Sequence, residues 1–169
     1  TIRTIGTAAT PQNLMTIKNG DATKILYVRR LLFQMDATAV LTSVMPIIKC
    51  SRTTDVPSAG NVLAKCLFDT ANASNANTVV RGSASSDGGA LSAVAATAGN
   101  VIWQQYGMRL HTAVGQVLGP DNNILPSLVD TENFILRQDE ALLIQVVAAA
   151  GASNPATNHY FVEVVWEEN

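Results

Sequence analysis

Charged residues are scarce in this chain of 169 residues: they make up 14% of it, against about 25% in an average soluble domain. Aromatic residues are few, at 5%, whereas apolar residues reach 47%. Disordered chains combine low hydrophobicity with high net charge, so this composition excludes disorder. The formal net charge of -2 leaves no surplus of Lys or Arg to neutralise phosphates, and we therefore expect no nucleic acid among the partners.

Cysteine is also scarce. Cys50 and Cys66 are too few for the disulfide framework of a small secreted scaffold, and we expect both to be reduced and buried, as free cysteine behaves like a small hydrophobic residue. Sequence alone leaves a bridge between them open, since that depends on their Cα separation. There is no CxxC pair, and His111 and His159 are far from both cysteines, so no metal site is expected. No run of about 18 apolar residues exists to cross a bilayer, so we expect no membrane partner.

The length is that of one domain, and the patterning is that of strands. Stretches rich in β-branched and aromatic residues are separated by turn residues about every 8–12 positions over much of the chain, which is typical of an antiparallel sandwich or barrel. No convincing amphipathic helix separates two strands, which excludes a parallel α/β fold. Residues 90–98 are compatible with one short helix or with a loop. Strands are predicted over residues 24–35, 39–50, 62–68, 79–81, 101–110, 134–136, 142–147 and 160–167.

The N-terminal stretch has a different composition. Residues 1–22 are rich in Thr, Ala, Asn and Gly, and only Leu14, Met15 and Ile17 suggest a short strand. We therefore expect an extended N-terminal arm over 1–22 and a single β-sandwich domain over 23–169.

No group of residues typical of an enzyme stands out. An acyl-transfer triad needs a base, but nothing singles out His111 or His159, and there is no GxSxG elbow. A glycosidase needs paired carboxylates, for which the candidates are Asp139, Glu140, Glu163, Glu167 and Glu168. The first two occupy a polar turn and the others lie on a strand, in the pattern of a solvated or subunit-facing side. We expect no enzymatic activity and no catalytic residue.

Cofactor sites are not indicated either. Gly88-Gly89 lacks the GKS or GKT ending of a phosphate-binding loop. Asp121, Asn122 and Asn123 favour a turn, because calcium needs six to eight oxygen ligands. No cofactor is therefore expected.

Two adjacent arginines interrupt an otherwise apolar strand. Because successive side chains of a strand point to opposite faces, Arg29 and Arg30 are expected on opposite faces, one of them toward the core side or a neighbouring subunit. One of the two is expected to donate a charge-assisted hydrogen bond to Glu163 or Glu167, inside the subunit or across an interface. These four residues are the predicted interface residues.

The end of the chain carries a family resemblance. Residues 134–145 (FILRQDEALLIQ) and 160–168 (YFVEVVWEE) predict a strand, a polar turn, a second strand and a final strand ending Trp-Glu-Glu. This block is similar to the end of many small structural proteins of tailed bacteriophages, and the Tyr27-Val28-Arg29-Arg30-Leu31 strand also looks like that group. The resemblance implies an all-β fold, an antiparallel jelly-roll β-sandwich of about eight strands. It implies a capsid decoration or cement protein that clamps neighbouring major-capsid subunits on the outer shell.

The partners that this resemblance implies are the major capsid protein and further copies of the chain, with a homotrimer favoured over a homodimer. The location would be the capsid surface of a virion assembled in the host cytoplasm. The strands over 25–35 and 142–147 are apolar on both faces, and a subunit interface would supply their second burial. The chain's ending also resembles tumour-necrosis-factor-like and complement-type trimeric heads. The alternative is therefore a receptor- or glycan-binding knob with its site on the loops 69–77 or 115–129, and a hydrolase is the least favoured hypothesis.

Overall fold

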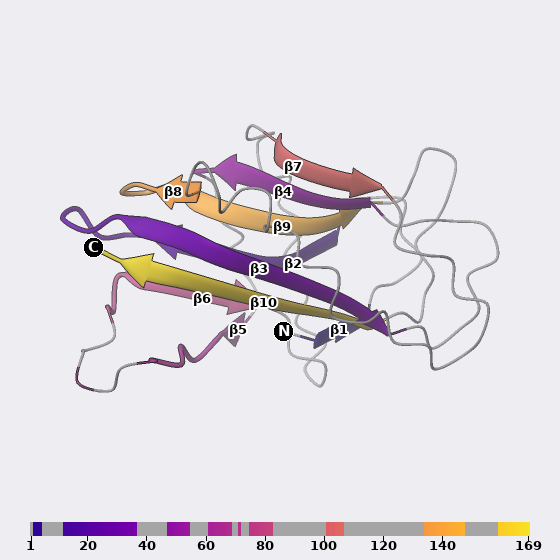
Figure 1. Ribbon diagram of the computed structural model, residues 1–169, viewed down its shortest axis with the longest axis horizontal. Helices are drawn as coiled ribbons and strands as arrows, with labels where there is room; N and C mark the ends of the chain where they lie inside the picture. Colours follow the sequence, from indigo (N-terminus) through magenta and orange to yellow (C-terminus); the bar gives the residue numbers. More distant parts are fainter. Residues whose placement is uncertain are drawn as a thin grey trace.

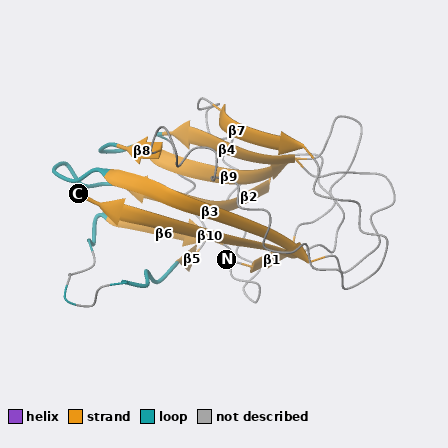
Figure 2. Cartoon of the chain, viewed as in Figure 1, coloured by secondary structure: helices purple, strands orange, loops and turns teal. Residues whose placement is uncertain are grey.

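The computed structural model describes residues 2–4, 12–36, 47–54, 61–68, 71, 75–82, 101–106, 134–147 and 159–169. These residues form two antiparallel β-sheets and no helix (Figure 2). Sheet A has the strand order β1-β10-β3-β8, and sheet B has the order β5-β6-β2-β9-β4-β7. The two sheets lie one over the other as a sandwich (Figure 1). The all-β sandwich expected from the sequence is confirmed.

The strands of sheet A are β1 (Ile2–Thr4), β10 (His159–Glu168), β3 (Leu26–Asp36) and β8 (Phe134–Leu136). Those of sheet B are β5 (Asn61–Val62), β6 (Thr78–Gly82), β2 (Gln12–Asn19), β9 (Ala141–Val147), β4 (Ile47–Thr53) and β7 (Val101–Tyr106).

The connectivity of these strands is that of a jelly roll. When β5 and β6 are set aside and the other eight strands are numbered 1 to 8 along the chain, sheet A reads 1-8-3-6 and sheet B reads 2-7-4-5. Strands from the two ends of the chain therefore pair with each other, as in a chain folded into two Greek keys. The β5–β6 hairpin is inserted between β4 and β7 and widens sheet B at its β2 side.

The core lies between the inward faces of the two sheets. On β9, Leu142, Ile144 and Val146 point into it, and on β10 Val162 and Val164 do so from the other side. Side chains of a strand point alternately to its two faces, so β10 contributes every second side chain to the core, as the alternation in the sequence predicts. One continuous core thus joins the first and last quarters of the chain.

The N-terminal stretch is part of this core. β2 lies between β6 and β9 in sheet B, and Leu14 and Ile17 are among the largest fully buried side chains. The expectation of an arm outside the core is therefore wrong for residues 12–19.

Buried polar residues conceal β2 in the sequence. Asn13, Thr16 and Asn19 have the composition of a loop, yet all three are buried. Asn13 Oδ1 accepts a hydrogen bond from Gln145 Nε2 on β9 at 2.8 Å. Because such a bond offsets the cost of burying an amide, polar residues are tolerated in the middle of the sheet.

The outer face of sheet B is also buried. Ala141 and Leu143 alternate with the core residues of β9 and are fully buried, and Ser51 and Thr53 beside them on β4 are nearly so. The two apolar faces of strand 142–147 predict that a subunit interface buries the second face. On β9 that face is instead buried within the single chain.

Most predicted strands agree with the structure to within one or two residues, but two differ more. Of the predicted strand 62–68, only Val62 belongs to the sheet, as the second residue of β5. β4 starts at Ile47, and the preceding residues of the predicted strand 39–50 lie outside the described residues, as do His111, the segment 90–98, the turn 121–123 and the loop 115–129.

Candidate interaction surface

The outer face of sheet A brings the predicted interface residues together. β3 and β10 are antiparallel. Arg30 lies opposite Val165, and Val28 lies opposite Trp166, so no residue of β10 lies opposite Arg29. Arg29 is therefore the extra residue of a β-bulge. Val28 and Leu31 on either side of the arginine pair are buried in the core. The bulge thus turns both arginines outward, and the expectation that they face opposite sides is wrong, because one extra residue interrupts the two-residue period.

Each arginine forms an ion pair with a different glutamate of β10. Arg29 donates from Nε to Glu167 Oε2 at 3.0 Å and also from Nη2. Arg30 donates from Nη2 to Glu163 Oε1. The predicted pairing with these carboxylates is confirmed, within the subunit, for both arginines. The result is a charge pattern with two positive and two negative groups fixed across two neighbouring strands.

Further contacts hold this pattern in place. The Arg29 guanidinium lies 5.4 Å from the centre of the Tyr27 ring, within the range of a cation–π contact. The hydrogen bond from Arg29, together with its charge, holds the pKa of Glu167 below its ordinary value. The four charged side chains are 38–50% exposed. Exposed ion pairs contribute little to stability, so their main effect is to fix the arrangement of charges on this face.

One end of the sandwich is closed by a polar network that the sequence does not reveal. Asn19, fully buried at the end of β2, donates from Nδ2 to the carbonyls of Lys24 and Leu136 and accepts from the Asp21 N–H. Because β2 belongs to sheet B and Leu136 to sheet A, this one amide joins the two sheets. The Asn-Gly-Asp sequence at 19–21 signals a turn but not this connection.

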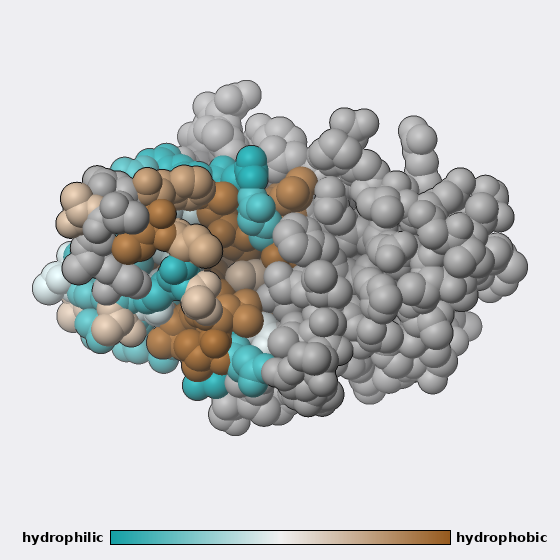
Figure 3. All heavy atoms as spheres, turned by 90° about the horizontal axis from the view of Figure 1, so that it is seen from below, coloured by the Kyte–Doolittle hydropathy of each residue, from teal (hydrophilic) through white to brown (hydrophobic). Residues whose placement is uncertain are grey.

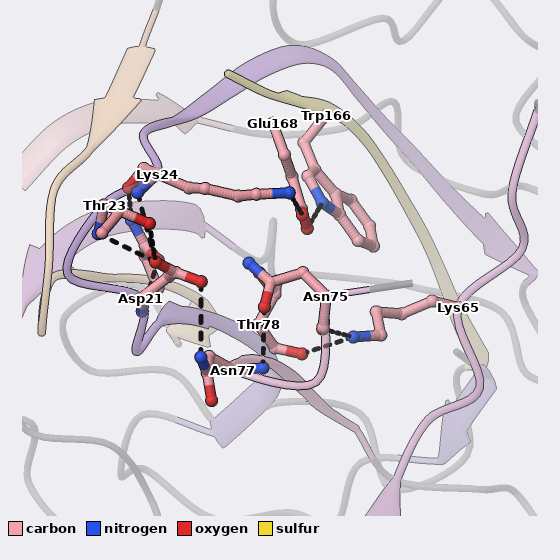
Figure 4. A network of polar contacts seen from close by, with 10 residues as sticks. Asp21, Thr23, Lys24, Lys65, Asn75, Asn77, Thr78, Trp166 and Glu168 are labelled. Atoms are coloured by element: carbon pink, nitrogen blue, oxygen red, sulfur yellow. Dashed lines mark hydrogen bonds and ion pairs between the residues drawn. The ribbon is translucent and has the colours of Figure 1, made fainter. Parts of the chain in front are cut away.

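The Asp21 carboxylate organises the β2–β3 turn (Figure 4). Its Oδ1 accepts from the N–H and hydroxyl of Thr23 and from the Lys24 N–H, and its Oδ2 accepts from Asn77 Nδ2. These bonds, with those from Thr23 the strongest, lower the pKa of Asp21. The turn that joins the two sheets is thereby tied to the loop that leads into β6.

Trp166 and Glu168 lie in the same corner (Figure 4). Trp166 donates from Nε1 to Glu168 Oε1 at 3.2 Å, and Glu168 Oε2 lies 3.9 Å from Lys24 Nζ. Facing them, Asn75 Nδ2 on the loop and Thr78 Oγ1 at the start of β6 are buried. This corner therefore combines a partly exposed indole and carboxylate with a buried polar layer beneath them.

The two cysteines lie in different environments. Both are free thiols. Cys50 is buried on β4, and burial raises its pKa to about 12. Cys66 is exposed, so the expectation that both are buried is wrong for this residue. It lies in the segment 61–68, which we call the strap; the strap leads away from β6 after Leu63 and presents several apolar side chains to solvent.

In the part of the chain that the structure describes, no three His, Cys, Asp or Glu residues are grouped so that they could hold a metal ion. The same residues contain no helix of the length and apolarity needed to span a membrane. Comparison with protein-family models, curated proteins and solved structures finds no significant match to this chain.

Proposed function

We propose that this protein is a non-enzymatic structural protein of a virion that decorates the outer shell and contacts major-capsid subunits. The observation that carries the proposal is the jelly-roll strand order, an architecture used repeatedly in viral capsid domains. The terminal block that resembles phage structural proteins forms β8 and β10 of sheet A and β9 of sheet B. Because a fold does not by itself define a function, the surface must supply the contact.

The outer face of sheet A suits such a contact. It is built on two long paired strands, and its arginines and glutamates are held in place before any partner arrives. Preorganised charges orient a partner at little entropic cost, and arginine is enriched in protein interfaces. We assign Arg29, Arg30, Glu163 and Glu167 to the contact with the shell.

The proposal is tested by looking for this protein in virus particles purified from the biological source of the sequence. Antibody against the purified chain is expected to detect it in sedimented, genome-filled particles at many copies per particle, and immunogold label is expected over the outer shell. Absence from the particles, or label confined to a tail, would overturn the decoration role. Purified R29E/R30E is expected to bind particles more weakly than the native chain, whereas K18E, altered on the other sheet, is expected to bind normally.

A glycan-binding role is the second candidate, and one observation favours it. Trp166 and Glu168, both partly exposed, lie at the same corner as the exposed amide of Asn77 (Figure 4). Amide, carboxylate and indole groups are the polar and aromatic partners that a sugar ring uses. A glycan array probed with the native chain and with N77A tests it. A sugar bound by the native chain and lost in N77A supports this role, and an array without signal excludes it for the glycans displayed.

A further inference from the structure

The strap presents a continuous apolar row to solvent. Its side chains alternate as in a strand: Val62, Ala64, Cys66 and Phe68 are exposed, whereas Leu63 packs against the core. Val62 is 63% exposed and Phe68 is 91% exposed, and neighbouring Leu67 is 43% exposed. Figure 3 views the molecule from the side on which β5 lies in Figure 1 and shows hydrophobic residues at this surface. Exposed apolar side chains gathered in one row suit contact with another apolar surface.

The row is held in a fixed orientation by the inward-facing residues of the strap. Leu63 N–H donates to the Val80 carbonyl of β6 at 2.9 Å. Lys65 donates from Nζ to the carbonyls of Asn75 and Thr78, so the one charged residue of the strap is turned toward the body of the molecule. Natural edge strands are usually guarded by outward lysines or by proline. The strap has neither on its outward row, which leaves it suited to association.

We propose that a second copy of this chain covers the strap, with the two apolar rows packed antiparallel about a two-fold axis near Lys65. A two-fold contact pairs a patch with itself, so the patch must complement its own reverse. Reversal about position 65 sets Val62 against Phe68 and Ala64 against Cys66, so each apolar side chain of one row meets an apolar side chain of the other. The row carries no charge that would be buried against a like charge. Sequence resemblance favours a trimer, whereas this self-complementary row favours a dimer.

The size of the row determines the strength expected of the contact. Four side chains on alternate residues span about 20 Å at ~3.3 Å per residue. A row of that length and about 10 Å wide offers on the order of 200 Å² per copy, well below the ~800 Å² per partner of a standard stable interface. We therefore expect weak self-association, with a Kd on the order of 100 μM, which a crowded surface would favour.

Sedimentation velocity over about 5–500 μM tests the proposal. The native chain is expected to move from monomer to dimer. F68S is expected to raise the Kd at least about tenfold, because its side chain is exposed in the monomer and its loss leaves the fold intact. V101S is the matched control, since Val101 is an exposed valine on β7 at the opposite edge of sheet B, and it is expected to dimerise as the native chain does. A monomer at 500 μM, a trimer, or a dimer that F68S leaves unchanged would overturn the proposal.

Cys66 provides an independent measure of the geometry. In the antiparallel arrangement the two Cys66 thiols lie close to the axis, so a short bismaleimide is expected to link them, and C66S is expected to give no product because Cys50 is buried. Loss of the cross-link in F68S supports the proposed packing, and an equal yield in F68S contradicts it. Neither experiment uses capsids. Self-association can therefore be disproved while the shell-binding role stands, and the shell-binding role can be disproved while self-association stands.

Discussion

Shortening one side chain of β2 tests whether the N-terminal stretch is core or arm. Ile17 is fully buried and lies opposite Val80 on β6 and Leu142 on β9. Ile17→Ala removes its outer carbons and leaves a cavity that the paired strands on both sides prevent from closing. Substitutions of this kind cost about 2–5 kcal/mol. An arm that does not pack on the core would lose almost nothing.

The loss is large enough to measure in two ways. For a domain of this length, 1 kcal/mol corresponds to a change in Tm of about 2–4 °C, so we expect I17A to melt roughly 5–15 °C lower than the native chain. With a urea m-value of about 1–3 kcal/mol per molar, the unfolding midpoint is expected to fall by about 1–2 M. Val62→Ala is the matched control, because Val62 is 63% exposed and such substitutions usually change stability by less than about 0.5 kcal/mol.

The outcome that would refute the assignment of β2 is equally definite. If I17A and V62A unfolded within about 1 °C of each other, Ile17 would not be part of a packed core. Deletion of residues 1–19 is a second test of whether β2 belongs to the fold, because it removes a strand that pairs with a neighbour on each side. We expect the truncated chain to lose cooperative unfolding, whereas a truncated chain that melts like the native one would restore the arm.

Three further measurements probe other parts of the molecule. The Asp21 carboxylate has a lowered pKa in the folded state, so it stabilises the fold above its unfolded-state pKa, and this stabilisation disappears as the pH falls through the folded-state pKa. D21N is therefore expected to melt below the native chain at pH 7, and the difference in Tm is expected to narrow below pH 4. A difference in Tm that does not narrow would mean that the network is absent. A thiol reagent is expected to modify Cys66 at once and Cys50 only after denaturation, and two equally fast thiols would contradict the burial of β4. The charge swap R30E/E163R is expected to recover the stability that R30E alone loses, with a coupling of about 0.2–1 kcal/mol in thermal melts, whereas additive effects would mean that the pair does not interact.

Sequence patterning predicts the strands whose two faces differ clearly in polarity. In β10, Val162 and Val164 alternate with Glu163 and Val165, and the structure buries the first pair. The polar turn before β9 is also predicted correctly, although it lacks glycine: Asp139 adopts a φ of 63°, a left-handed conformation that aspartate tolerates better than most residues. Period and turn chemistry are local properties, and a single sequence contains them.

The features that sequence patterning misses depend on partners distant in the chain. Thr16 is polar but fully buried on the outer face of sheet B, so its environment is set by tertiary structure rather than by its own composition. The bulge at Arg29 is one extra residue with no local signal, and it alone decides that both arginines share a face. The strap has the alternation of a strand, yet only its first two residues belong to the sheet. Assigning residues 62–68 to a strand of the sheet therefore hides the exposure of Phe68.

The described surfaces differ in what they can bind, and this difference separates the two proposals. Sheet B is buried on its outer face near Leu143, sheet A carries paired charges near Arg29 and Arg30, and the strap presents an apolar row that ends at Phe68. Apolar burial drives association, whereas paired charges chiefly set orientation and on-rate. Self-association through the strap should therefore resist added salt, and shell binding through sheet A should weaken with it. We expect R29E/R30E to dimerise normally. We expect F68S to bind particles normally in any assay that keeps the chain dilute. A variant that abolished both dimerisation and particle binding would mean that the two surfaces form one site.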